Sequence, residues 1–365
     1  MNNEVLSALI PALESGERCA VATLVDARGS TPQKVGAALF VGADGRTAGT
    51  LGGGCVEAEA FEAARGAIAS GETRLLDFAL NEDLAVDYGL ACGGTEVIFV
   101  DPTFSKTDLR LLEALTETQA EGGRAVLLTR TAAPAAGQRL AVWEDGRAIG
   151  GADADLRAIA ERALRDDATP GLTSLASGEQ VYVHPFEPSP SVVVVGAGYV
   201  GRAVATAAKF AGNRVVVIDD RPDFANRERF PDADEVIADD IEPAVARTRA
   251  SRNTAIVIVT RGHKYDYQAT AAALRTGAGY IGLMGSRRKV ALIYRQLAAD
   301  GVPAERLRDV HAPIGLDIGA VSPEEIAISI VAEITKHRLG GSGGSLRIDG
   351  AVTERAVRKR GRAGA

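Results

Sequence analysis

A cysteine that directly follows three glycines is the first feature of this sequence that could do chemistry. The segment Gly52-Gly53-Gly54-Cys55 leads into an alanine-rich stretch of helical character. A thiol at a helix N-terminus has a lowered pKa and becomes a better nucleophile or a ligand for a soft metal ion. Cys92, followed by Gly93-Gly94, also lies beside bare backbone, whereas Cys19 opens an apolar strand and is expected in the core. Both Cys55 and Cys92 could instead be small buried residues in tight turns, but a glycine triplet favours access for a ligand.

A second glycine-rich segment has the pattern of a dinucleotide-binding turn. Four valines, 192–195, precede Gly196-Ala197-Gly198-Tyr199-Val200-Gly201, and a helical segment follows. Gly196 would permit the tight turn, Gly198 would let a diphosphate approach the backbone, and Gly201 would let the helix pack on the strand. The alternative is that the glycines serve tight packing alone.

The acid expected in such a site is present. Asp219 ends the second strand of the pattern and favours an unphosphorylated ribose, as in NAD. Arg221 beside it could instead accept a 2′-phosphate, as in NADP. The turn could also hold another cofactor that contains a diphosphate.

Two further segments are expected at the same edge of the sheet. His263 follows a strand that should neighbour the first strand of the dinucleotide pattern, so it could act in acid–base chemistry, contact a ligand or lie free on a surface loop. Ser286, Arg287 and Arg288 begin another helix, where Ser286 is a possible cap. Cations at a helix N-terminus oppose the helix dipole, so a bound anion would relieve that cost, although a solvated basic turn is the simpler alternative.

The elements that must position these residues fall into two parts. The sequence predicts a mixed α/β N-terminal domain over residues 1–186, a proline-containing linker at 187–191, a doubly wound parallel sheet of Rossmann type over 192–338, and a flexible basic tail at 339–365. The N-terminal pattern predicts helices at 4–14, from about 55 to 71, 109–120 and 154–165, and strands at 19–25, 37–41, 46–50, 73–79, 95–100, 124–130, 139–143 and 180–186. The C-terminal pattern predicts strands at 192–195, 214–219, 235–238, 255–259 and 279–283, and helices at 199–211, 266–276, 286–300 and 323–337. We see no internal repeat in the sequence.

Composition excludes several classes of protein. The chain has 365 residues, 46% of them hydrophobic, and a formal charge of −7, so a nucleic-acid-binding protein is not expected. No apolar run approaches the length of a membrane span, and the first residues lack a basic leader, so we expect a cytoplasmic protein without membrane contact. Three widely spaced cysteines and four histidines show neither a disulfide pattern nor a zinc-ligand pattern.

Several motifs, in order along the chain, resemble the xanthine dehydrogenase accessory protein (XdhC/CoxI) family. In the N-terminal part they are Gly29-Ser30-Thr31-Pro32, the run from Gly49 to Glu57, and Cys92-Gly93-Gly94. In the C-terminal part they are the segment from Val192, residues 220–222 with 224–225 and 229–231, residues 260–263, residues 285–289 and residues 313–319. The resemblance covers about residues 5–338, and it is less distinctive over 103–186.

The resemblance implies a chaperone for the molybdenum cofactor rather than an enzyme. Such a protein holds molybdopterin-type cofactor while its terminal sulfido ligand is installed, and delivers it to a molybdenum hydroxylase such as xanthine dehydrogenase. The implied partners are that apo-enzyme, a cysteine desulfurase and a second copy of the chain. Cys55 is then the first candidate for contact with molybdenum and Cys92 the second.

Two rival hypotheses follow from the residues. The chain could be an NAD(P)-dependent oxidoreductase that uses His263 as its acid–base residue. It could also be an interaction scaffold whose bound nucleotide is only structural. Turnover of reduced nicotinamide would favour the first rival, and nucleotide retention without pterin binding would favour the second.

Overall fold

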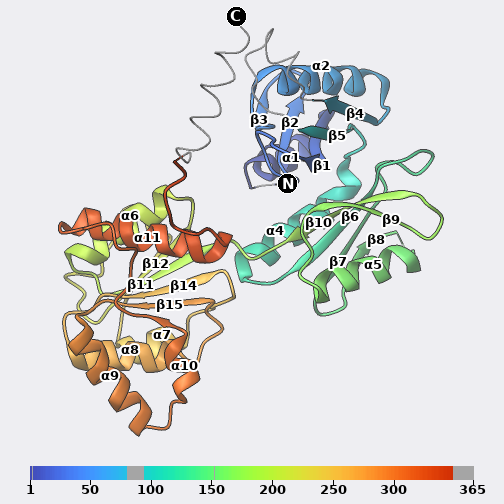
Figure 1. The fold of residues 1–365 in the computed structure, drawn as a ribbon. Coiled ribbons are helices and arrows are strands. Elements are labelled where there is room, and N and C mark those ends of the chain that lie inside the picture. The colour runs from blue at the N-terminus through green and yellow to red at the C-terminus, as the bar shows by residue number, and fades with distance from the viewer. Residues whose placement is uncertain (2, 80–93, 152, 348–365) are drawn as a thin grey trace, which may run out of the picture. The chain divides into compact units, whose positions relative to one another are not determined.

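The computed structural model describes residues 1, 3–79, 94–151 and 153–347, which form two compact units, Met1–Ser189 and Pro190–Ala365. Each unit has its own sheets and core (Figure 1). Among the described residues, no helix is both long and apolar enough to cross a bilayer.

The N-terminal unit begins with a five-stranded antiparallel sheet in the order β3-β2-β1-β5-β4. Its elements are α1 (Asn3–Ser15), β1 (Cys19–Arg28), β2 (Ala38–Gly42), β3 (Thr47–Gly49), α2 (Gly54–Ser70), β4 (Arg74–Ala79) and β5 (Thr95–Asp101). The apolar side of α2, including Val56, Ala60 and Ala64, packs on one face of the sheet against Leu24 and Ile98. This packing fixes the start of α2 beside the loop that follows β3.

A second sheet of the same unit has the order β8-β7-β6-β10-β9. Its elements are the 3-10 turn η1 (Lys106–Asp108), α4 (Leu109–Glu121), β6 (Ala125–Arg130), β7 (Arg139–Trp143), β8 (Ala148–Gly150), α5 (Ala154–Arg165), β9 (Gly171–Ser174) and β10 (Gln180–Phe186). Helix α5 covers one face, while α1 and α4 share a core with residues of both sheets, among them Phe40 and Trp143.

The two halves of the N-terminal unit repeat one topology. Over the described residues, each runs helix, three strands, helix, two strands, and each sheet has the same order of strands. The hairpins also match, because Leu39 pairs with Gly49 in the first and Leu140 with Gly150 in the second. Both hairpin turns carry an Asp-Gly-Arg sequence whose Asp accepts from the backbone N–H of the Arg. The expectation that the chain has no internal repeat is therefore wrong.

The C-terminal unit is a six-stranded parallel sheet in the order β13-β12-β11-β14-β15-β16. Its strands are β11 (Ser191–Val195), β12 (Arg214–Asp219), β13 (Glu235–Ala238), β14 (Thr254–Ile258), β15 (Tyr280–Leu283) and β16 (Val310–His311). Its helices are α6 (Tyr199–Phe210), α7 (Ile241–Ala246), α8 (His263–Ala273), α9 (Arg287–Ala299), α10 (Ala304–Arg308) and α11 (Pro323–Leu339).

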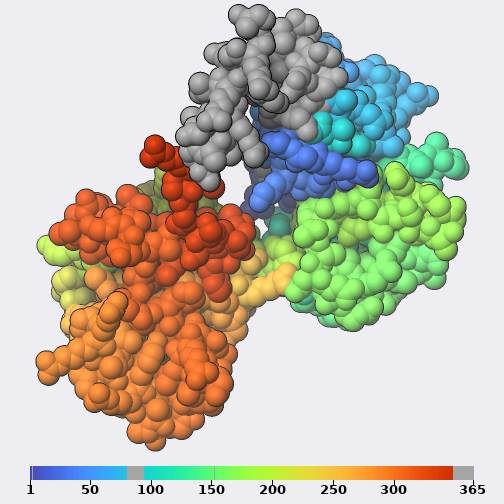
Figure 2. Space-filling view, in the orientation of Figure 1, coloured from blue at the N-terminus to red at the C-terminus, as the bar shows by residue number. Residues whose placement is uncertain are grey.

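Helices cover both faces of this sheet, which confirms the predicted doubly wound Rossmann architecture. Helices α6 and α11 pack on one face, and α7, α8 and α9 pack on the other. Figure 2, in the same orientation, shows a continuous orange surface around α9 and α10. Side chains therefore fill the gaps that separate the ribbons there in Figure 1. The sheet's valines and isoleucines are buried on both sides, as expected for a parallel sheet.

One predicted boundary is wrong in a way that bears on function. Helix α8 begins at His263 rather than at residue 266, because Gly262 acts as its N-cap. His263 therefore lies in the first turn of a helix and not in the preceding loop. The start of α11 follows a capping box in which Ser322 accepts from the N–H of Glu325, and the Glu325 carboxylate accepts from that of Ser322.

A group of side chains whose stabilising effect depends on pH links β15, β16 and α11. Burial alone would raise the pKa of Glu333, but bonds from His311, Tyr280 and the N–H of Gly315 outweigh it and lower that pKa to about 2. A depressed carboxylate pKa stabilises the fold above the unfolded-state value near 4.5 and loses that effect as the pH falls toward 2.

We therefore predict that Glu333→Gln lowers the free energy of unfolding at neutral pH by roughly 3 kcal/mol and flattens its pH dependence between about pH 4.5 and 2. Urea unfolding across this pH range measures both effects. An unchanged acid limb in the variant would contradict the assignment.

Candidate functional site

The loop before α2 adopts a backbone that only glycine tolerates well. Gly52, Gly53 and Gly54 have φ angles of 105°, 78° and 69°. A β-carbon on Gly52 would lie 2.8 Å from Cβ of Pro32, whereas one on Gly53 would meet nothing within 4 Å. The loop is thus tight on one side and open on the other.

The carboxylate of Glu57 holds this loop in place. Its Oε2 atom accepts from the Thr50 hydroxyl at 2.6 Å and from the backbone N–H groups of Leu51 at 2.7 Å and Gly53 at 3.2 Å. Burial would raise the pKa of Glu57, but these hydrogen bonds outweigh it and leave the pKa below its ordinary value. No role of its own was expected for Glu57 from the sequence, because its hydrogen-bonding partners are brought to it only by the folded loop.

Cys55 is the second residue of α2 and is partly exposed. The structure therefore places it in the first turn of a helix, as the sequence predicted. Cys19 is buried in the core, and burial raises the pKa of its thiol to about 11. Cys92 lies outside the described residues. Gly94 is described, and it is packed so closely that a β-carbon there would lie 2.5 Å from the carbonyl oxygen of Arg28.

The repeat supplies an internal comparison for the start of α2. In α5 the N-cap is Asp153, whose Oδ1 accepts from the N–H groups of Asp155 at 2.9 Å and Leu156 at 3.1 Å. In α2 the N-cap is Gly53, and no side chain of the described residues caps the helix. Among the residues that the structure describes, no side chain therefore accepts from the first turn with Cys55, whereas its counterpart is capped by the chain's own carboxylate.

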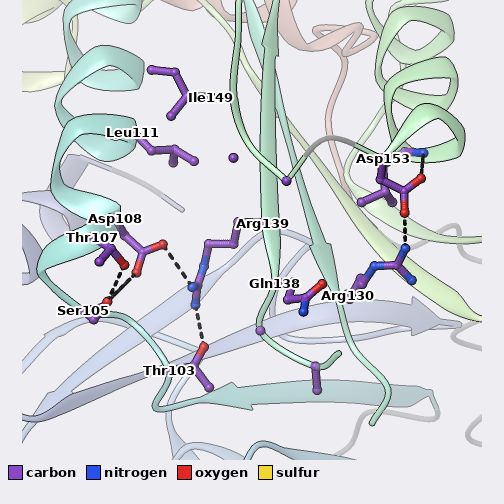
Figure 3. Close-up of a pocket in the computed structure, with 15 residues that line it drawn as sticks. Thr103, Ser105, Thr107, Asp108, Leu111, Arg130, Gln138, Arg139, Ile149 and Asp153 are labelled. Carbon is purple, nitrogen blue, oxygen red and sulfur yellow. Dashed lines mark hydrogen bonds and ion pairs between the residues drawn. The ribbon is translucent and has the colours of Figure 1, made fainter. Parts of the chain in front are cut away.

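A cavity of about 700 Å³ lies in the second repeat, between the start of α4, β7, β8 and the start of α5 (Figure 3). Arg139, whose side chain is 4% exposed, pairs there with Asp101 and Asp108, and Arg130 pairs with Asp153 and Glu179. Each guanidinium is already balanced by two carboxylates. The walls of this cavity therefore offer no surplus positive charge for a phosphate-bearing ligand, and none of the residues predicted from sequence lines it.

The glycine-rich turn of the C-terminal unit has the geometry that its sequence predicts. Gly196 has a φ of 117°, and a β-carbon there would lie 2.5 Å from the carbonyl oxygen of Val259. A β-carbon on Gly201 would collide with the carbonyl oxygen of Gly196. Gly198, the N-cap of α6, has open space around it, so a ligand can approach its backbone.

Asp219 is 2% exposed and is engaged within the protein. Its Oδ2 accepts from the N–H of Ala197 at 2.8 Å and from Nη2 of Arg221 at 3.0 Å. Its Oδ1 accepts from the backbone N–H and the Nε of Arg221, at 3.0 and 2.8 Å. These four donors match the roughly four acceptor positions of a carboxylate. Asp219 thus links the glycine-rich turn to Arg221.

Two arginines beside this turn contact one aromatic ring. The guanidinium carbons of Arg221 and Arg229 lie 3.7 and 4.9 Å from the centre of the Phe224 ring. Nη2 of Arg229 donates to the carbonyl of Ala197 at 3.3 Å. The sequence singled out Arg221 but gave Arg229 no separate role, because only the fold brings Arg229 to the turn.

The other predicted residues of this unit lie at the same edge of the sheet. Strand β14 pairs with β11 in parallel, as expected, so α8 with His263 and α9 with Arg287 and Arg288 begin near the glycine-rich turn. All three side chains are exposed, and Ser286 caps α9 through the N–H of Lys289. Within the described part of the chain, His263 has no hydrogen-bonding partner. The nearby Asp266 is buried, accepts from Thr260 and pairs with Lys289.

These observations define a Rossmann-type domain joined to a duplicated antiparallel α/β unit. Comparison with known proteins agrees with the geometry. A sequence model of the XdhC Rossmann domain matches residues 192–334, and a model of the XdhC and CoxI family matches residues 12–79. Together they span more than half of the chain, which belongs to the XdhC/CoxI family.

Three relatives span nearly the whole chain. A protein of Bacillus subtilis (strain 168), described as a probable xanthine dehydrogenase component, is 28% identical over 89% of this chain and 95% of its own length. The molybdenum cofactor insertion chaperone PaoD of Escherichia coli (strain K12) is 23% identical over 92% of this chain and 88% of its own length. A crystal structure described as a xanthine dehydrogenase from Bacillus halodurans shares the fold, with a TM-score of 0.74, 23% identity and coverage of 94% of this chain and 98% of that one.

We predict that Glu57→Ala lowers the free energy of unfolding by about 1–3 kcal/mol, because it removes a charged acceptor from the Thr50 hydroxyl and two backbone N–H groups. Thermal or urea unfolding measures the change. Glu59→Ala is the matched control, since Glu59 is an exposed acid on the same helix. Equal stabilities of the two variants would show that Glu57 does not hold the loop.

Proposed function

We propose that this chain binds the molybdenum cofactor and supports its insertion into a molybdenum hydroxylase such as xanthine dehydrogenase. The observation that carries the proposal is the open N-terminus of α2 with Cys55 in its first turn. Free N–H groups at a helix start suit an anionic ligand, and a thiol there suits a soft metal centre. The names of the relatives from Bacillus subtilis and Escherichia coli support the same role.

Each of the two units offers its own candidate residues for a bound cofactor. In the N-terminal unit, the Gly52–Gly54 backbone and Cys55 would face the metal-bearing end, and Cys92 is the second sulfur candidate. In the C-terminal unit, Gly196, Gly198 and Gly201 would receive phosphate. His263, Ser286, Arg287 and Arg288 would line that edge. Asp219 would position the turn rather than contact the cofactor. NAD(P) is the other ligand that this turn could take.

The bound cofactor would be protected while its terminal sulfido ligand is installed, with a cysteine desulfurase as the sulfur source. The further partners are the apo-hydroxylase and a second copy of the chain. We place this process in the cytoplasm. The family resemblance motivates these partners. The start of α2, which carries the Cys55 thiol, is the site where each of them would meet the cofactor.

An oxidoreductase that uses His263 finds less support in the geometry. An acid–base histidine is usually oriented by a second hydrogen-bonding group. Asp266, the nearest acid on α8, is instead committed to Thr260 and Lys289. We therefore prefer the chaperone to a nicotinamide-dependent enzyme.

We predict that Cys55→Ala abolishes most of the activation of apo-hydroxylase by added cofactor while the chaperone stays folded. Cys55 is partly exposed, so loss of its sulfur removes little packing. The measurement is hydroxylase activity after incubation with cofactor and chaperone, alongside circular dichroism and thermal melting of the variant.

Cys19→Ala is the control, because Cys19 is a buried core thiol. It is expected to lower the melting temperature yet retain activation at temperatures where it is folded. Activation by Cys55→Ala equal to that of the wild type would remove Cys55 from the mechanism.

A further inference from the structure

Beside Asp219, the edge of the C-terminal sheet carries an arginine that no acidic side chain of the described residues pairs with. Arg221 is paired with Asp219, and Arg261 with Asp220. Among the described residues, Arg229 has no carboxylate partner. The acids closest to it in sequence, Glu228 and Asp232, are exposed and do not pair with it.

The Nε of Arg229 is a buried donor that lacks an acceptor within the described chain. A buried donor without an acceptor costs about 1–3 kcal/mol, so its retention calls for an acceptor from outside the chain. The guanidinium is held by the Ala197 carbonyl and the Phe224 ring, directly beside the glycine-rich turn. It is therefore fixed in position at the place where a ligand's phosphate would approach.

The hydrogen bonds that Asp219 already accepts limit which ligand group could bind beside it. A ribose with free hydroxyls needs an available acceptor, but both oxygens of Asp219 already accept two N–H groups each. A phosphate needs donors, and the guanidinium groups of Arg221 and Arg229, which both contact the Phe224 ring, would supply them. The arrangement thus favours an added phosphate over an unmodified sugar.

We propose that Arg229, with Arg221 and Phe224, forms a subsite for a phosphate monoester carried by the ligand of the glycine-rich turn. This inference rests on the proposed function, because it concerns the ligand bound at that turn. Two molecules carry such a group: a dinucleotide with a ribose 2′-phosphate, and molybdopterin with its terminal phosphate. Their shared chemistry is a dianionic phosphate monoester.

The test is calorimetric titration of the full chain with 2′,5′-ADP and with 5′-AMP, which differ only in the 2′-phosphate. The wild type is expected to bind 2′,5′-ADP at least tenfold more tightly, and the preference should shrink as salt is added. Arg229→Gln should lose at least tenfold in affinity for 2′,5′-ADP but less than twofold for 5′-AMP. The affinity of Arg229→Lys for 2′,5′-ADP should lie between those of the wild type and Arg229→Gln, since lysine keeps the charge but lacks the planar pair of donors.

The matched control is Arg214→Gln. Arg214 lies at the opposite, amino end of β12 and pairs with Glu235 at 3.0 Å, so its replacement should leave both affinities unchanged. Thermal melting of each variant checks its fold. Two results together would overturn the proposal. The first is that the wild type binds the two nucleotides equally, or binds neither. The second is that replacement of Arg229 does not change the affinity for pterin in the titration below.

A second titration separates the two sources and the two proposals. Isolated molybdopterin is added before and after phosphatase treatment. Phosphate-dependent binding that needs Arg229 assigns the subsite to the pterin. A preference for 2′,5′-ADP without any pterin binding supports the subsite but contradicts the cargo proposed above. Pterin binding that ignores both the phosphate and Arg229, together with equal binding of the two nucleotides, supports the cargo and overturns the subsite.

Discussion

The N–H groups that begin an α-helix have no acceptor within that helix, and the chain meets this constraint differently in its two repeats. In α5 the carboxylate of Asp153 accepts two of them. In α2 the same place in the topology is occupied by Gly53, and the nearby carboxylate of Glu57 is turned toward the loop instead. The repeat thus separates a helix start that a carboxylate caps from one that no side chain of the described residues caps, and the uncapped one carries Cys55.

In the C-terminal unit, a side chain holds the glycine-rich turn in place. The turn between β11 and α6 has open space beside Gly198 and is nevertheless held rigid. Asp219 provides the rigidity, since one carboxylate ties the N–H of Ala197 to the guanidinium of Arg221. In a dinucleotide site this acid is expected to face the ribose. Here it is engaged inside the protein, where it accepts four N–H groups.

Much of the fold was predictable because its signals are local. The valine-rich strands, the Gly196–Gly201 turn and the capping box at Ser322 and Glu325 each depend on residues close in sequence. The internal repeat was missed because the two halves share a topology and an Asp-Gly-Arg turn but few other residues. The roles of Glu57 and Arg229 were missed for a different reason: each depends on partners that only the fold brings near, and a sequence pattern does not show which acceptors are already occupied.

The proposed function requires the chain to carry a pterin. The most direct measurement is mass spectrometry, with pterin fluorescence, of small molecules released from the full chain after anaerobic purification from cells supplied with molybdate. The account predicts a molybdopterin-type pterin bound to the purified protein. Release of a nicotinamide nucleotide alone, or of no pterin from protein that is fully folded, would contradict it.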